Sequence, residues 1–163
     1  MDSDDYSVPD RFKKQFNVIK KNPDLAVVGA QVAEFSGNID NIIGYRKVPS
    51  DNETISQFIK WRNPFNHPTV VINKKVLDKV GGYLPFCNLE DYYLWARIIG
   101  NHYQVFNLPD VLTYMRVDNG LYSRRGHLRN LLYFYKLRNL LRKNRLINYR
   151  EQFMGDFVMS VNI

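Results

Sequence analysis

Two groups of acidic residues have the types and the spacing for chemistry at an oxygen-rich site. The first is Asp2, Asp4 and Asp5, and the second is the pair Glu90 and Asp91. In an extended segment Asp2 and Asp4 point to the same side, about 6.6 Å apart, so they can share one hard cation. Mg²⁺ and Mn²⁺ prefer such ligands and keep positions open for substrate phosphates. The alternative is a solvated acidic segment that caps the following helix.

The pair Glu90 and Asp91 opens a predicted helix and is followed by aromatic residues. Asp91 and Trp95 are four residues apart, so they share one face of that helix. A carboxylate beside aromatic rings can act as a general base, with the rings as a platform for a sugar. The alternative is that both acids favour the positive end of the helix dipole and that Trp95 belongs to the core.

Five short segments occur in an order that has a known counterpart. They are Met-Asp-Ser-Asp-Asp at 1–5, Asn-Pro-Phe-Asn-His-Pro-Thr-Val-Val-Ile at 63–72, Val-Gly-Gly-Tyr at 80–83, Glu-Asp-Tyr-Tyr-Leu-Trp-Ala-Arg at 90–97 and Leu-Thr-Tyr-Met-Arg-Val at 112–117. Together they resemble the second half of the catalytic domain of a family 2 glycosyltransferase, a domain of the GT-A fold. The resemblance covers residues 1–126 and starts at the family's Asp-x-Asp motif.

The resemblance implies transfer of a sugar from a nucleotide-diphosphate donor to an acceptor hydroxyl, with inversion. Asp2 and Asp4 would hold Mn²⁺ or Mg²⁺ at the donor diphosphate, with Asp5 as a further contact. Asp91 would take the proton from the attacking hydroxyl, and Glu90 of the same motif is the second catalytic candidate. The implied acceptor is a glycan or a lipid-linked glycan, as in the synthesis of bacterial capsule or lipopolysaccharide.

Four further residues are candidates for the acceptor side of the resembling site. We expect Trp95 and Tyr92 to stack against the acceptor. Arg97 is a candidate for an acceptor phosphate, or a structural ion-pair partner. His67 contributes to the acceptor site, or it is a buried residue held by hydrogen bonds.

The chain departs from the family in two places. Many relatives have His shortly after the Arg of the last motif, where this chain has Asp118, which is either an oxygen ligand or a turn residue. Family members also place a nucleotide-binding half before the Asp-x-Asp motif. We therefore expect the chain to be a fragment of an enzyme that is inactive alone.

The elements that must position these residues alternate between helix and strand. Helices are predicted at 7–21, 54–61, 74–80, 89–99 and from 127 onward, and strands at 25–32, 69–72, 103–108 and 111–116. The last two strands are expected to meet at a turn at Pro109 and Asp110. This alternation predicts an α/β protein: a partial GT-A fold with a mixed sheet and flanking helices over residues 1–118, then a basic helical tail over 119–163.

Composition narrows the class of protein. Hydrophobic residues make up 45% and charged residues 24% of the 163 residues, which excludes disorder of the whole chain. No apolar run approaches the ~18 residues that a membrane span requires. The single Cys87 excludes an internal disulfide. We expect a cytoplasmic location, with peripheral contact at the inner face of the membrane.

The net charge of +7 is concentrated near the end of the chain, where residues 124–150 hold nine Lys or Arg and no acid. A helix there carries a leucine-rich stripe of Leu128, Leu131, Leu132, Tyr135 and Leu140. The helix either docks on an anionic membrane or packs this stripe on the domain and leaves a basic face in water. No zinc-finger, RNA-recognition or helix-turn-helix pattern supports a nucleic-acid partner. A non-catalytic membrane- or polyanion-binding module derived from a degenerate transferase is the alternative function.

Overall fold

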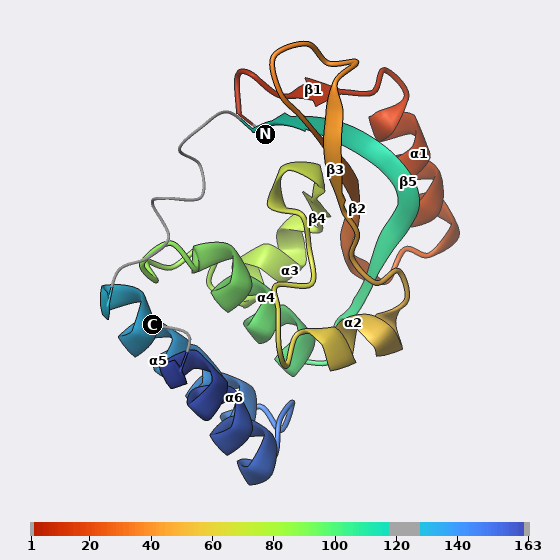
Figure 1. The fold of residues 1–163 in the computed structure, drawn as a ribbon. Coiled ribbons are helices and arrows are strands. Elements are labelled where there is room, and N and C mark those ends of the chain that lie inside the picture. The colour runs from red at the N-terminus through yellow and green to blue at the C-terminus, as the bar shows by residue number, and fades with distance from the viewer. Residues whose placement is uncertain (1, 118–127, 162–163) are drawn as a thin grey trace.

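The computed structural model describes the backbone of residues 2–117 and 128–161, and the side chains of residues 2–117 and 132–155. In this part of the chain, a mixed five-stranded sheet carries helices on both faces (Figure 1). The predicted class, α/β with a mixed sheet and flanking helices, is confirmed. It is consistent with part of a nucleotide-sugar transferase fold.

The sheet has the strand order β1-β5-β2-β3, and β4 also pairs with β2. The strands are β1 (Tyr6–Ser7), β2 (Leu25–Phe35), β3 (Ile42–Arg46), β4 (Val71–Ile72) and β5 (Gln104–Arg116). The helices are α1 (Arg11–Lys21), α2 (Asn52–Phe58), α3 (Lys74–Lys79), α4 (Glu90–Gly100), α5 (Leu128–Lys143) and α6 (Tyr149–Val161), with a 3₁₀ turn at His67–Thr69. β5 runs parallel to β2, and the other pairings are antiparallel.

The central strand β2 is buried almost throughout, as its continuous apolar sequence predicts. On one face of the sheet, Val28 packs with Leu112 of β5 and with Ile19 of α1. On the other face, Val27 joins a larger core that includes Trp95 of α4. The two cores fix the helices against the sheet, so the start of α4 has a defined position relative to the strand ends.

The predicted turn at Pro109 and Asp110 is wrong, because β5 continues through both residues. The pairing with β2 shifts register between Ala30 and Gln31, whose partners are Leu108 and Val111. This irregularity accommodates Pro109, which has no N–H for a regular ladder. Asp110 accepts a hydrogen bond of 2.9 Å from Lys14 instead of forming a turn.

One helix start and one strand also differ from expectation. The helix predicted from residue 7 begins at Arg11, because Tyr6 and Ser7 pair with β5. The polar stretch 40–52 had no clear period, yet it contains the edge strand β3. Ile43 and Tyr45 share one face and are 54% and 60% exposed, whereas Ile42 lies on the other face, so apolar side chains occur on both faces of the strand.

The C-terminal helices α5 and α6 lie side by side, with α5 against α4 (Figure 1). Leu137 and Leu141 are buried in the same core as Trp95, which favours the packing alternative for α5. The predicted stripe is only partly right: Leu132 is 63% exposed, whereas Leu140 is partly buried. The side chains of residues 128 and 131 lie outside the described part. The predicted boundary at residue 118 also falls there and stays a prediction.

Candidate active site

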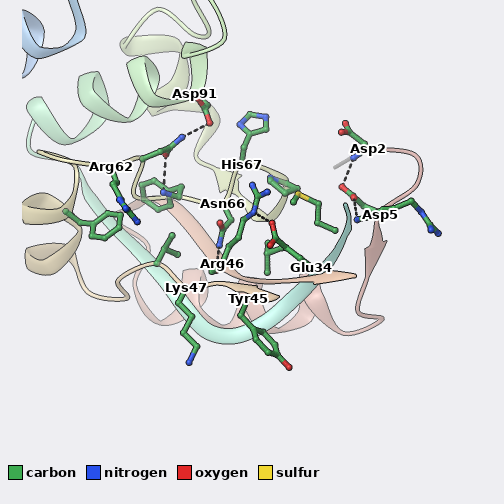
Figure 2. A pocket seen from close by; sticks show the side chains of 18 of the residues that line it. Asp2, Asp5, Glu34, Tyr45, Arg46, Lys47, Arg62, Asn66, His67 and Asp91 are labelled. Carbon is green, nitrogen blue, oxygen red and sulfur yellow. Dashed lines mark hydrogen bonds and ion pairs between the residues drawn. The ribbon is translucent and has the colours of Figure 1, made fainter. Parts of the chain in front are cut away.

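A cleft of about 720 Å³ brings both acidic groups together. Asp2, Asp4 and Asp5 line it from the N-terminal segment, and Asp91 lines it from the start of α4. Figure 2 shows Asp2 and Asp5 at one end and Asp91 at the other, with His67 between them. Residues far apart in the sequence therefore share one cavity.

The N-terminal acids form a turn and not the extended segment that we expected. Asp5 N donates to Asp2 O over 3.3 Å, and Asp2 N donates to Asp5 Oδ2 over 3.0 Å. Arg116 N donates to Asp5 Oδ1 over 3.2 Å, so Asp5 ties this turn to the end of β5. Asp2 and Asp4 are exposed, and no described residue donates a hydrogen bond to either carboxylate.

Asp91 is half-buried in the first turn of α4 and is held by a second loop. Asn63 Nδ2 donates to Asp91 Oδ2 over 2.7 Å, and Tyr92 N donates to Asp91 Oδ1 over 2.6 Å. Burial, and next the charge of Asp91, raises the pKa of Tyr83. The carboxylate therefore has a fixed orientation at the cleft.

The loop that carries Asn63 is anchored to the sheet by buried amide side chains. Asn107 Nδ2 donates to Pro64 O over 3.0 Å, and Asn66 Nδ2 donates to Ala30 O over 3.0 Å. Asn107 also lies so close to Gly29 that a Cβ there would approach its Oδ1 to 2.1 Å, so β2 requires glycine at this point. These contacts fix the loop against the sheet, and the loop in turn fixes Asp91 through Asn63.

Glu90 does not line the cleft, although its neighbour does. Its Oε1 accepts hydrogen bonds from Phe86 N over 3.4 Å and from Asn88 N over 3.1 Å. Cys87 and Asn88 have φ angles of 48° and 62°, a left-handed conformation that such bonds stabilise. The geometry gives Glu90 a structural role in the loop before α4.

The structure contradicts three of the expected acceptor contacts. Trp95 has no exposed surface and packs against Phe65 with ring centroids 5.1 Å apart. Tyr92 is 6% exposed and donates from its hydroxyl to Ile59 O over 2.6 Å. Because both rings lie in the core, neither presents a face to a sugar.

Arg97 is also buried and belongs to the scaffold. Its guanidinium donates to the carbonyls of Val80 and Gly82, the latter over 2.7 Å, and lies 4.7 Å from the Tyr93 ring centroid. Burial lowers the pKa of Arg97. It therefore binds neither an acceptor phosphate nor a carboxylate here, and it closes the loop that follows α3.

His67 is exposed, so the alternative in which it is buried is wrong. It begins the 3₁₀ turn and lines the cleft, with its ring centroid 5.8 Å from that of Tyr83. Of the four acceptor candidates it alone lies in a position to meet a ligand.

The cleft also contains cations that sequence reasoning missed, namely Arg46, Lys47, Arg62 and Arg116. Arg46 forms an ion pair with Glu34, and Arg116 donates to Gly37 O over 2.6 Å. Lys47 and Arg62 are exposed and form no ion pair with a described residue. Arg46, Lys47 and Arg62 lie outside the five motifs, so no sequence signal pointed to them, whereas Arg116 and Asn63 lay within the motifs at 112–117 and 63–72.

The carboxylates of Asp2 and Asp4 suit a hard cation that is bound partly by the protein and partly by a phosphate-bearing substrate. Within the described ranges, no group of three His, Cys, Asp or Glu side chains converges on one point. Mg²⁺ is commonly bound by one or two carboxylates together with substrate phosphates. Asp2 and Asp4 fit this mode, since no described residue occupies their oxygens. Asp118 lies outside the described residues.

Known proteins are similar to this chain over most of its length, although no protein-family model matches it. It is 45% identical over 125 residues to an uncharacterized glycosyltransferase of Haemophilus influenzae, a match to 77% of this chain and 46% of that protein. It is 33% identical over 150 residues to the amylovoran biosynthesis glycosyltransferase AmsE of Erwinia amylovora, with coverages of 90% and 56%.

A third relative has a more specific name. The UDP-Gal:alpha-D-GlcNAc-diphosphoundecaprenol beta-1,3-galactosyltransferase of Escherichia coli is 32% identical over 160 residues, with coverages of 98% and 56%. The chain spans about half the length of these curated relatives. Among the described residues, no helix combines the length and the apolar character needed to cross a bilayer. The chain is therefore a homologue of glycosyltransferases over about half of their length.

Proposed function

We propose that this chain forms the metal and acceptor part of an inverting family 2 glycosyltransferase, which transfers a sugar from a nucleotide-diphosphate donor to a hydroxyl. The observation that carries the proposal is the shared cleft, lined by Asp2 and Asp4 at one end and by Asp91 at the other. Homology to proteins named as transferases supports the reaction class. The same homology does not favour a non-catalytic binding module.

Asp2 and Asp4 are the residues that would hold Mn²⁺ or Mg²⁺. When bound, the cation neutralises negative charge that builds on the departing diphosphate. Asp5 positions both carboxylates by fixing their turn to β5 through Arg116 N. The exposed cations Lys47 and Arg62 add positive charge to the cleft, which favours phosphate-bearing ligands.

Asp91 is the proposed general base. Its carboxylate accepts the proton of the acceptor hydroxyl as the hydroxyl oxygen attacks the anomeric carbon and the bond to the diphosphate breaks. One displacement inverts the configuration and needs one base, so no covalent intermediate on the protein is required. Asn63 keeps the carboxylate turned toward the cleft.

Two of the relatives support a place in the synthesis of bacterial surface polysaccharide. AmsE is named for amylovoran biosynthesis, and the Escherichia coli relative is named for a diphosphoundecaprenol-linked acceptor. We propose by analogy a glycan or lipid-linked glycan as the acceptor. His67 and Arg62 lie in the cleft near Asp91 and are the residues best placed to contact it (Figure 2).

The test is the substitution Asp91→Asn in the intact protein that contains these residues. Loss of the base is expected to lower the transfer rate by about 10²–10⁴-fold. The matched control is Asp110→Asn, because Asp110 pairs with Lys14 outside the cleft and its loss is expected to leave transfer unchanged. Full turnover in Asp91→Asn, with the same melting temperature as the parent, would remove Asp91 from the role of base.

A further inference from the structure

One face of α6 carries large apolar side chains in water. Tyr149, Phe153 and Met154 are 76%, 73% and 59% exposed, and their spacing places them on one side of the helix. The opposite side packs on α5, where a Cβ at Gly155 would meet the guanidinium of Arg138 at 2.1 Å. We call the side formed by Tyr149, Arg150, Phe153 and Met154 the outer face of α6.

Exposed positive charge predominates in the described part of α5 and α6. Four Lys or Arg side chains between residues 132 and 155 are exposed, namely Lys136, Lys143, Arg145 and Arg150, and Glu151 is the one acidic residue in that range. Glu151 pairs with Lys60 over 3.0 Å, so its charge is compensated. Arg150 lies within the outer face, while Lys143 and Arg145 are exposed at the connection between the two helices.

The aromatic and cationic groups are also in direct contact. The guanidinium carbon of Arg142 lies 4.7 Å from the Tyr149 ring centroid, a cation–π arrangement. Helices that lie on membranes combine an apolar face that enters the headgroup region with Lys and Arg that meet anionic lipids. Leu137 and Leu141 of α5 do not serve this purpose, because both are buried in the core.

We propose that the outer face of α6 rests on a membrane surface rich in anionic phospholipid. The largely exposed side chains of Phe153 and Met154, together with the excess of positive charge, complement the apolar and anionic groups of such a lipid surface. Contact with the membrane would bring the protein to a lipid-linked acceptor. This link to acceptor binding rests on the proposed function, whereas membrane binding itself does not. Vesicle binding itself is measured without any transfer of sugar.

The test is co-sedimentation of the full chain with vesicles of pure phosphatidylglycerol and of pure phosphatidylcholine. We expect binding to phosphatidylglycerol that weakens with added salt, and little binding to phosphatidylcholine. Phe153→Ser with Met154→Ser is expected to lower the partition coefficient roughly tenfold or more. The matched control is Phe12→Ser with Phe16→Ser on α1, where the side chains are 69% and 63% exposed.

A second pair of variants tests the charge. Lys143→Gln with Arg150→Gln is expected to weaken binding to phosphatidylglycerol about 25-fold, or about fivefold for each charge. Lys20→Gln with Lys21→Gln removes the same charge from the exposed end of α1 and is expected to have a much smaller effect. All four variants change exposed side chains, so we expect their melting temperatures to match that of the parent.

Two results would overturn the proposal: no binding to phosphatidylglycerol, or equal losses in the α1 and α6 variants. A change in the oligomeric state of the α6 variants with unchanged vesicle binding would assign the outer face to a second copy of the chain instead. Cation-dependent binding of UDP, measured on the same protein, responds to the proposed function and not to the α6 surface. The two ideas can therefore fail separately.

Discussion

The two ends of the cleft differ in how their carboxylates are held. Asp91 is half-buried, accepts a hydrogen bond from Asn63 and starts a helix whose body lies in the core. Asp2 and Asp4 are exposed, and only Asp5 ties their turn to the sheet. Folding therefore preorganises the Asp91 end more than the Asp2 end, where we propose that a bound cation would complete the geometry.

This contrast predicts its largest effect at the exposed end. In the intact protein, Asp2→Ala with Asp4→Ala removes both proposed cation ligands. Mn²⁺-dependent binding of UDP is expected to weaken roughly 100-fold or more, while the melting temperature stays unchanged because neither side chain has a described partner. Isothermal titration with and without Mn²⁺ measures the binding. Intact Mn²⁺ dependence would show that the cation is bound elsewhere, and a lower melting temperature would make these acids structural.

A smaller effect is expected when the support of Asp91 is changed and Asp91 itself is kept. Asn63→Ala removes the amide that orients Asp91, so kcat is expected to fall about tenfold while KM changes little. Steady-state kinetics separates the two constants. The control is Asn41→Ala, because the Asn41 amide donates to Ser36 O and neither residue lines the cleft. A change confined to KM would indicate that Asn63 contacts substrate and does not position the base.

The smallest effect concerns the support behind Asp91. Tyr92→Phe removes the hydroxyl that donates to Ile59 O and is expected to cost about 1 kcal/mol of unfolding free energy. Burial raises the pKa of Tyr92, so the folded protein keeps the phenol protonated while the unfolded chain ionises near pH ~10. The contribution of this phenol is therefore complete below pH ~10 and is lost as the pH rises further.

Urea unfolding at several pH values measures this contribution. The difference in unfolding free energy between the parent and Tyr92→Phe is expected to shrink above pH ~10. Tyr45→Phe serves as the control, because Tyr45 is 60% exposed and its hydroxyl forms no hydrogen bond with a described residue. A difference that is constant with pH would mean that the Tyr92 phenol ionises equally in both states.

Sequence reasoning located the elements that bury continuous apolar surface. The run that forms β2 and the helix that begins at Glu90 were both predicted. The turn at Pro109 was not correct, because a Pro-Asp pair suggests a turn locally, while pairing with β2 decides between a turn and a bulge. The edge strand β3 was not predicted, because its apolar residues Ile42, Ile43 and Tyr45 lie on both faces. The sequence therefore does not alternate between apolar and polar residues.

The candidate site was predictable in part for a similar reason. The order of the motifs identified both acidic groups as site candidates. In the structure, the cleft is lined by Asp2, Asp4, Asp5 and Asp91. Trp95 shares a helix face with Asp91, but it lies one turn further along the helix, where it is buried against Phe65. A helical pattern states which residues share a face and not where along the helix that face enters the core.

The segment of residues 58–62, at the end of α2, contacts both the C-terminal helices and the cleft. Arg138 of α5 donates to Lys60 O over 3.1 Å, and Lys60 also pairs with Glu151 of α6. The adjacent Phe58 and Arg62 line the cleft. Helices α5 and α6 and the cleft thus share one short support, residues 58–62. If a ligand at the cleft and a ligand at α6 each displaced this support, each would change the affinity of the other by the same factor.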